Sequence, residues 1–136
     1  MAPLDEARSL LALALEDAAA FRILISSRSV RPATALFHAQ QAVEKAIKAV
    51  LVLHGVPYGR THDLVELGYR AEEAVPDVPF AIDRLLRLNP YAVAFRYGVP
   101  AVDLLEPEEA EEVVAAATAW ADAYIRAAED RKGAAG

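Results

Sequence analysis

The chain has 136 residues, the usual size of one domain and too few for two full hydrophobic cores. Hydrophobic residues make up 55%, which suffices for a packed core, and the absence of cysteine excludes disulfides, thiolate metal sites and cysteine nucleophiles. The net charge of −6 argues against non-specific nucleic-acid binding, although residues 22–96 carry ten basic and seven acidic side chains. Because charges interrupt every apolar run and the start is acidic, the sequence predicts a cytoplasmic protein without a membrane segment.

Two long helices are predicted first. Apolar side chains recur at helical spacing over residues 4–27, and Asp5 and Glu6 lie in the first turn, where the helix dipole favours negative charge. The second helix is predicted to open at Pro32, since proline is tolerated in a first helical turn, and to end near His54. A short turn joins the two helices, so we expect them to pack antiparallel.

Two shorter helices are predicted next. One runs from Asp63 to about Ala74, with Thr61 or His62 as its N-terminal cap. The other covers residues 78–88. Proline follows each of them within a few residues and does not continue a helix.

The last part of the chain is predicted to form an irregular segment followed by a final helix. Residues 90–106 are expected to mix a helical turn with extended loop, because glycine and proline interrupt the pattern. Pro107 opens a last helix that begins with four glutamates and runs to about Glu129, and residues 131–136 are expected to fray. No segment alternates like a strand, so residues 1–136 are predicted to form a single all-α domain, an up-and-down bundle of four to five helices.

The second predicted helix has a polar stripe beside a broad apolar arc. The members of the polar stripe are His38, Gln41, Lys45 and Lys48, and Gln40 and Glu44 lie beside them. Glu44 and Lys48 are four residues apart, in the order that favours an ion pair. Two interpretations stay open: the wet face of an amphipathic helix, or a groove whose lysines, histidine and glutamines contact phosphate and sugar or base edges.

The same helix and the loop after it resemble the signature of HEPN domains. Residues 37–51 read FHAQQAVEKAIKAVL and residues 61–64 read THDL. In that family an hxxQAxEKxxKAxL pattern precedes a tHdL box. Residues 89–91 (NPY) and 96–97 (RY) resemble the family's tyrosine and RY segment. The resemblance covers roughly residues 5–130 and is most specific over the first two motifs.

The resemblance implies a helical bundle that forms a homodimer, pairs with a separate minimal nucleotidyltransferase, and takes a nucleotide or RNA. Some relatives are RNA-cleaving toxins of toxin–antitoxin pairs, and others look like the substrate-binding half of a split nucleotidyltransferase. The RNA-cleaving branch uses an arginine followed four to six residues later by a histidine. No histidine follows Arg96 at that spacing, so catalysis by Arg96 and His62 would need one residue from each subunit of a dimer.

Three functions follow as hypotheses. The first is a non-catalytic nucleotide- or substrate-binding subunit of a nucleotidyltransferase; the alternatives are an RNA-cleaving toxin or its degenerate form, and a protein-interaction scaffold. The residues predicted to contact a ligand are Gln41, Lys45, Lys48, His62 and Arg96. Arg96 and His62 are also the weak candidates for catalysis. We expect no cofactor and no metal, since no histidine or carboxylate spacing makes a metal site.

Overall fold

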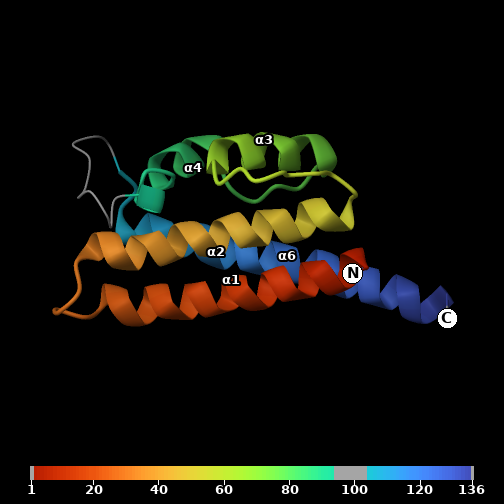
Figure 1. Cartoon of the computed structure of the whole chain (residues 1–136), viewed down its shortest axis with the longest axis horizontal. Coiled ribbons are helices and arrows are strands. Elements are labelled where there is room, and N and C mark those ends of the chain that lie inside the picture. Colours follow the sequence, from red (N-terminus) through yellow and green to blue (C-terminus); the bar gives the residue numbers. More distant parts are fainter. Residues whose placement is uncertain (1, 94–103, 136) are drawn as a thin grey trace.

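The computed structural model describes residues 2–93 and 104–135 of the chain (Figure 1). Over these residues it contains helices and no strands, which confirms the predicted all-α class. The helices are α1 (Pro3–Ile25), α2 (Pro32–Leu53), α3 (Leu64–Ala74), α4 (Ile82–Leu88) and α6 (Pro107–Ala135). None of the helices in this part of the chain is long and apolar enough to cross a membrane.

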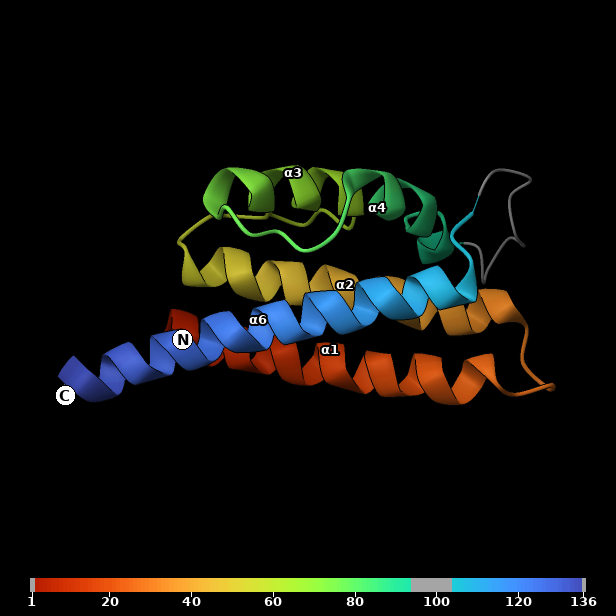
Figure 2. The ribbon, with the colours of Figure 1, turned by 180° about the vertical axis from the view of Figure 1, so that it is seen from behind.

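Helix α2 is the centre of the fold. It lies antiparallel to α1, as predicted, and α6 packs against both of them on the side that faces the viewer in Figure 2. Helix α3 packs on α2 from a third direction, and α4 contacts both α3 and α6. Three neighbours therefore bury most of α2, and its alanines let them approach closely.

The path between α2 and α3 decides which residues meet. In both views, residues 54–63 run back along α2, so α3 begins beside the middle of α2 and runs in the same direction (Figures 1 and 2). The reversal starts at Gly55, whose φ of +67° favours glycine, and the Val56 N–H bonds back to the carbonyl of Leu51. The predicted stop of the second helix is thereby confirmed, and the returning segment brings the THDL motif over α2.

The cap of α3 differs from the prediction. Neither Thr61 nor His62 caps the helix: the Asp63 carboxylate accepts the backbone N–H groups of Val65 and Glu66, so the helix begins at the next residue, Leu64. A carboxylate in this position satisfies two orphan donors and also suits the positive end of the dipole. The Thr61 hydroxyl instead donates to the Glu66 carboxylate at 2.9 Å, and His62 takes no part in the cap.

Two predicted boundaries were wrong. Helix α4 begins at Ile82 rather than at residue 78, because Pro79 disfavours a helical residue before it and Phe80 is buried edge-on against the Trp120 ring, 5.5 Å between centroids. Helix α6 ends at Ala135 rather than near Glu129, whereas fraying of the tail stays a prediction. Alanine, arginine and lysine are strong helix formers, and one glycine in the last turns lowers stability by only about 1 kcal/mol.

Candidate binding site

A buried carboxylate organises half of the polar stripe on α2. The side chain of Glu44 is 3% exposed and that of Lys48 is 9% exposed, and the Lys48 ammonium donates to Glu44 Oε2 at 3.0 Å. The predicted ion pair is therefore confirmed. Gln40 is fully buried and donates to Glu44 Oε1 at 3.2 Å, while Gln41 donates to Gln40 Oε1 at 2.6 Å. This half of the stripe is a continuous hydrogen-bonded network and not a wet helix face.

His62 reaches the same carboxylate from the returning segment. Its Nδ1 lies 2.9 Å from Glu44 Oε2, and its backbone carbonyl accepts a bond from Gln40 at 3.4 Å. Because a carboxylate only accepts, the proton of this bond belongs to Nδ1 of the imidazole. The side chain of His62 is nevertheless 71% exposed, so Nε2 is left for other contacts. The arrangement is an exposed imidazole held by a buried acid.

The start of α3 fixes the backbone directly after His62. Asp63 is bound by two N–H groups of its own helix, and the Asn89 amide donates to Asp63 Oδ1 at 3.4 Å. The side-chain oxygen Oδ1 of Asn89 accepts the N–H of Leu64 at 3.0 Å. Asn89, at the end of α4, thus ties α4 to the THDL motif and limits the movement of the histidine.

An aromatic side chain closes the network toward the N-terminus of α1. The Lys48 ammonium lies 5.2 Å from the centroid of the Tyr58 ring, within the range of a cation–π contact. The Tyr58 hydroxyl donates to Glu6 Oε1 at 3.0 Å. Burial raises the pKa of Tyr58, and the hydrogen bond to Glu6 raises it further. Tyr58 therefore remains a donor well above neutral pH.

The other half of the polar stripe turns toward α1. The Lys45 ammonium lies 2.5 Å from Asp17 Oδ2, and His38 Nδ1 lies 3.0 Å from Asp17 Oδ1. The Asp17 side chain is 14% exposed, whereas those of Lys45 and His38 are 24% and 30% exposed. Asp17, like Glu44, binds one lysine and one histidine, and its carboxylate is more exposed to solvent than that of Glu44.

The predicted ligand residues fall into three groups. Lys48 and His62 contact Glu44, and Gln41 joins them through Gln40, whereas Lys45 is directed to Asp17 instead. The fifth, Arg96, and the RY motif lie outside the described residues. Contact of these residues with a ligand stays a prediction. Both lysines already have carboxylate partners and Gln41 donates to Gln40, so the exposed His62 is the member best able to bind an added molecule.

Sequence reasoning missed the acid on α1. Asp17 lies in the middle of a helix whose neighbouring turns are apolar, and such an interruption is a usable signal for a buried polar contact. It also placed Gln40 and Glu44 only beside the predicted site, although they form its base. Within residues 2–93 and 104–135, no cluster of three histidine, aspartate or glutamate side chains is arranged to hold a metal ion.

These features define an all-helical domain with a charge-compensated polar network along its central helix. A family model described as HEPN domain matches residues 7–126 of the chain. The match covers most of the sequence, and the chain belongs to the HEPN domain family. Comparisons with curated proteins and with solved structures found no match.

Proposed function

We propose that this HEPN domain is a non-catalytic subunit that binds a nucleotide, or a substrate with a phosphate or sugar group, for a separate minimal nucleotidyltransferase. In this proposal the domain acts as a homodimer and the partner supplies the chemistry of transfer. The observation that carries the proposal is the His62 imidazole, which is exposed to solvent and yet held by the buried Glu44 carboxylate. A hydrogen bond to the ring nitrogen that does not meet the ligand holds a binding histidine in one orientation.

The network suits a ligand with both acceptors and donors. When it is protonated, His62 donates through Nε2 to a phosphate oxygen; when it is neutral, the same nitrogen accepts from a sugar hydroxyl or a base amino group. Gln41 adds an amide that joins the network through Gln40, and Lys48 supplies the charge that balances Glu44. The ligand thus gains hydrogen bonds at a network whose own lysine and carboxylate already balance each other.

The arginine–histidine spacing argues against RNA cleavage by His62 within one chain. Neither His54 nor His62 follows an arginine at the spacing of the RNA-cleaving branch, and His38, which has six residues between it and Arg31, lies 3.0 Å from Asp17 Oδ1 through its Nδ1. His62 has its Nδ1 engaged by Glu44, and proton transfer in an RNA-cleaving site also needs a cation for the phosphate charge. Lys48, the nearest cation to His62 in this network, is already paired to Glu44.

Calorimetric titration of the purified chain with AMP and ATP tests the proposal. We expect the chain to bind these nucleotides. His62→Ala should raise the dissociation constant about tenfold, which corresponds to a loss of about 1.4 kcal/mol of binding free energy. His54→Ala is the matched control, because His54 caps the end of α2 against the Val50 carbonyl and has no contact with Glu44. Equal losses in both variants would contradict a role for His62.

A second measurement separates binding from catalysis. Incubation of the purified chain with labelled single-stranded RNA should leave the RNA intact. Cleavage that disappears in Arg96→Ala would replace the proposal by the RNA-cleaving alternative. If neither nucleotide binds and the RNA stays intact, the protein-interaction scaffold is the function that remains.

A further inference from the structure

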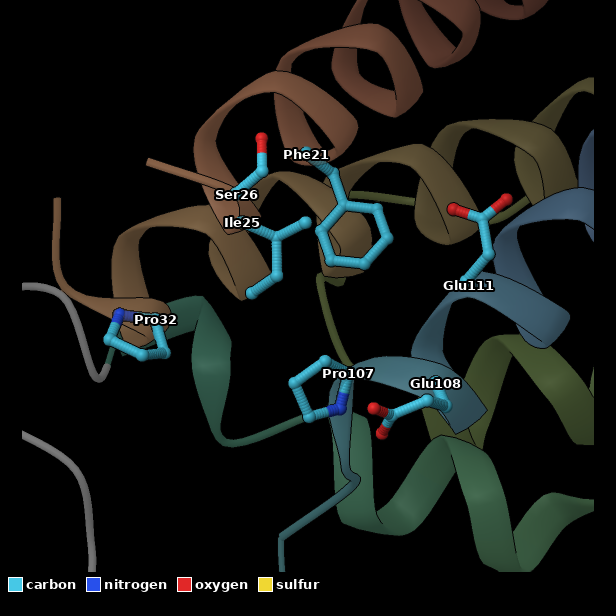
Figure 3. A pocket seen from close by; sticks show the side chains of 7 residues that line it. All are labelled: Phe21, Ile25, Ser26, Pro32, Pro107, Glu108 and Glu111. Atoms are coloured by element: carbon cyan, nitrogen blue, oxygen red, sulfur yellow. The ribbon is translucent and has the colours of Figure 1, made fainter. Parts of the chain in front are cut away.

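A pocket of about 620 Å³ lies at the end of the bundle where α1 ends and α2 and α6 begin (Figure 3). Phe21 and Ile25, from the last turns of α1, form its apolar floor, and the rings of Pro32 and Pro107 stand on either side. The volume falls in the range of about 300–1,000 Å³ that small-molecule sites occupy. No residue of the polar stripe lines it, so it is a separate place on the molecule.

The walls of this pocket are formed in advance. Pro32 and Pro107 are the first residues of α2 and α6, where the fixed φ of proline matches the helix. Phe21 is buried, and Ile25 is half-buried and reaches the opening. An apolar body of a ligand can cover Ile25 and the two rings at about 25 cal/mol for each Å² removed from water.

Two of the three polar residues around the pocket are already engaged. The Ser26 hydroxyl donates to the Ile23 carbonyl at 3.0 Å. Arg22 holds the Glu111 carboxylate through two nitrogens, with Nη2 at 2.8 Å from Oε1, and this bond to Glu111 raises the pKa of Arg22. Neither group is left to select a ligand.

Glu108 is the third polar residue, and it differs from its neighbours. The other three glutamates at the start of α6 each pair with an arginine of another helix: Glu109 with Arg87, Glu111 with Arg22 and Glu112 with Arg84. Glu108 has no ion pair with any residue in the described part of the chain. In Figure 3 its carboxylate lies beside the Pro107 ring, at the edge of the pocket.

We infer that this pocket binds a small organic cation whose apolar body rests on Ile25 and the two proline rings and whose protonated nitrogen pairs with Glu108. An anionic ligand meets repulsion from the same carboxylate, and a neutral ligand gains only the apolar contact. The charge on Glu108 therefore sets the selectivity, while the apolar floor supplies most of the affinity.

Three probes that share one apolar body test this inference: 4-phenylbutylamine, 4-phenylbutan-1-ol and 4-phenylbutyrate. In a titration of the full chain followed by ¹H–¹⁵N spectra, the amine should bind with a dissociation constant on the order of 1 mM, which suits its size. The shifted amides should belong to residues around Ile25 and Pro107. The alcohol should bind several times more weakly than the amine, and the carboxylate more weakly again.

Glu108→Gln should weaken binding of the amine about fivefold and leave binding of the alcohol unchanged. Glu112→Gln is the matched control, because it removes the same charge one turn further along α6, away from the pocket, and should leave binding of the amine unchanged. The inference is overturned if the alcohol or the carboxylate binds as well as the amine. It also fails if the two variants respond alike, or if the shifted amides lie elsewhere.

Discussion

The two acid-centred clusters along α2, one at Glu44 and one at Asp17, use the same chemistry in different surroundings. Glu44 and Asp17 each bind one lysine and one histidine, but Glu44 is 3% exposed and shares its helix with Lys48, whereas Asp17 is 14% exposed and reaches across from α1. Glu44 ties α2 to the segment before α3, and Asp17 ties α1 to α2. Because the partners are of the same kind and the burial differs, we expect burial of the acid to set how much each cluster contributes to stability.

Removal of the Glu44 carboxylate should have the largest effect. Glu44→Ala leaves the Lys48 ammonium buried without its partner, and breaking a buried pair in this way lowers the free energy of unfolding by about 3–5 kcal/mol. Urea denaturation followed by circular dichroism measures the loss. Glu44→Ala combined with Lys48→Met should recover part of it, because no charge is then left unpaired. A loss below about 1 kcal/mol would show that water reaches Lys48 freely.

The same change on the α1 side should be milder. Asp17→Ala should lower the free energy of unfolding by about 1–2 kcal/mol, since Lys45 and His38 are partly exposed and water can replace the lost acceptor. The same denaturation measurement gives the loss of unfolding free energy for both variants, so that the two acids can be compared directly. An effect of Asp17→Ala equal to that of Glu44→Ala would remove the distinction between the two clusters.

Loss of the α3 cap should disturb one cluster and spare the other. Asp63→Ala removes the acceptor of two N–H groups and should lower the free energy of unfolding by about 1 kcal/mol. Because His62 precedes the cap, its imidazole signals in nuclear magnetic resonance spectra should broaden or shift, whereas those of His38 should not. Equal changes at both histidines would indicate that the clusters are coupled.

Truncation of the exposed imidazole should have the smallest effect on stability. The His62 side chain is 71% exposed, so His62→Ala should lower the free energy of unfolding by about 0.5 kcal/mol or less while the nucleotide affinity falls. Denaturation and calorimetry on the same sample separate the two quantities. A large loss of stability would mean that His62 serves the fold more than a ligand.

Local rules were enough to predict much of this arrangement. The spacing of Glu44 and Lys48 within one helix, the opening of that helix at Pro32 and its end before Gly55 each depend on neighbouring residues, and the structure confirms all three. The motif that includes Glu44 also led to the correct family. Sequence reasoning works where the interacting groups are a few residues apart.

Contacts between residues far apart in the sequence could not be predicted from neighbouring residues. The Lys45 partner, Asp17, is 28 residues away on another helix, and nothing local marks the pair. The contact of His62 with Glu44 depends on the reversal after α2, which an ordinary helical hairpin would not produce. The late start of α4 has this origin in part, because burial of Phe80 against Trp120 adds to the local effect of Pro79.

The most direct test of the central claim is a titration with AMP observed through the histidine ring nitrogens in long-range ¹H–¹⁵N spectra. In the free protein, His62 should carry a proton on Nδ1, and added AMP should shift its Nε2 signal while the ring of His54 stays unchanged. If AMP leaves the His62 ring unaffected, or shifts both histidines alike, the exposed imidazole above Glu44 is not a binding group.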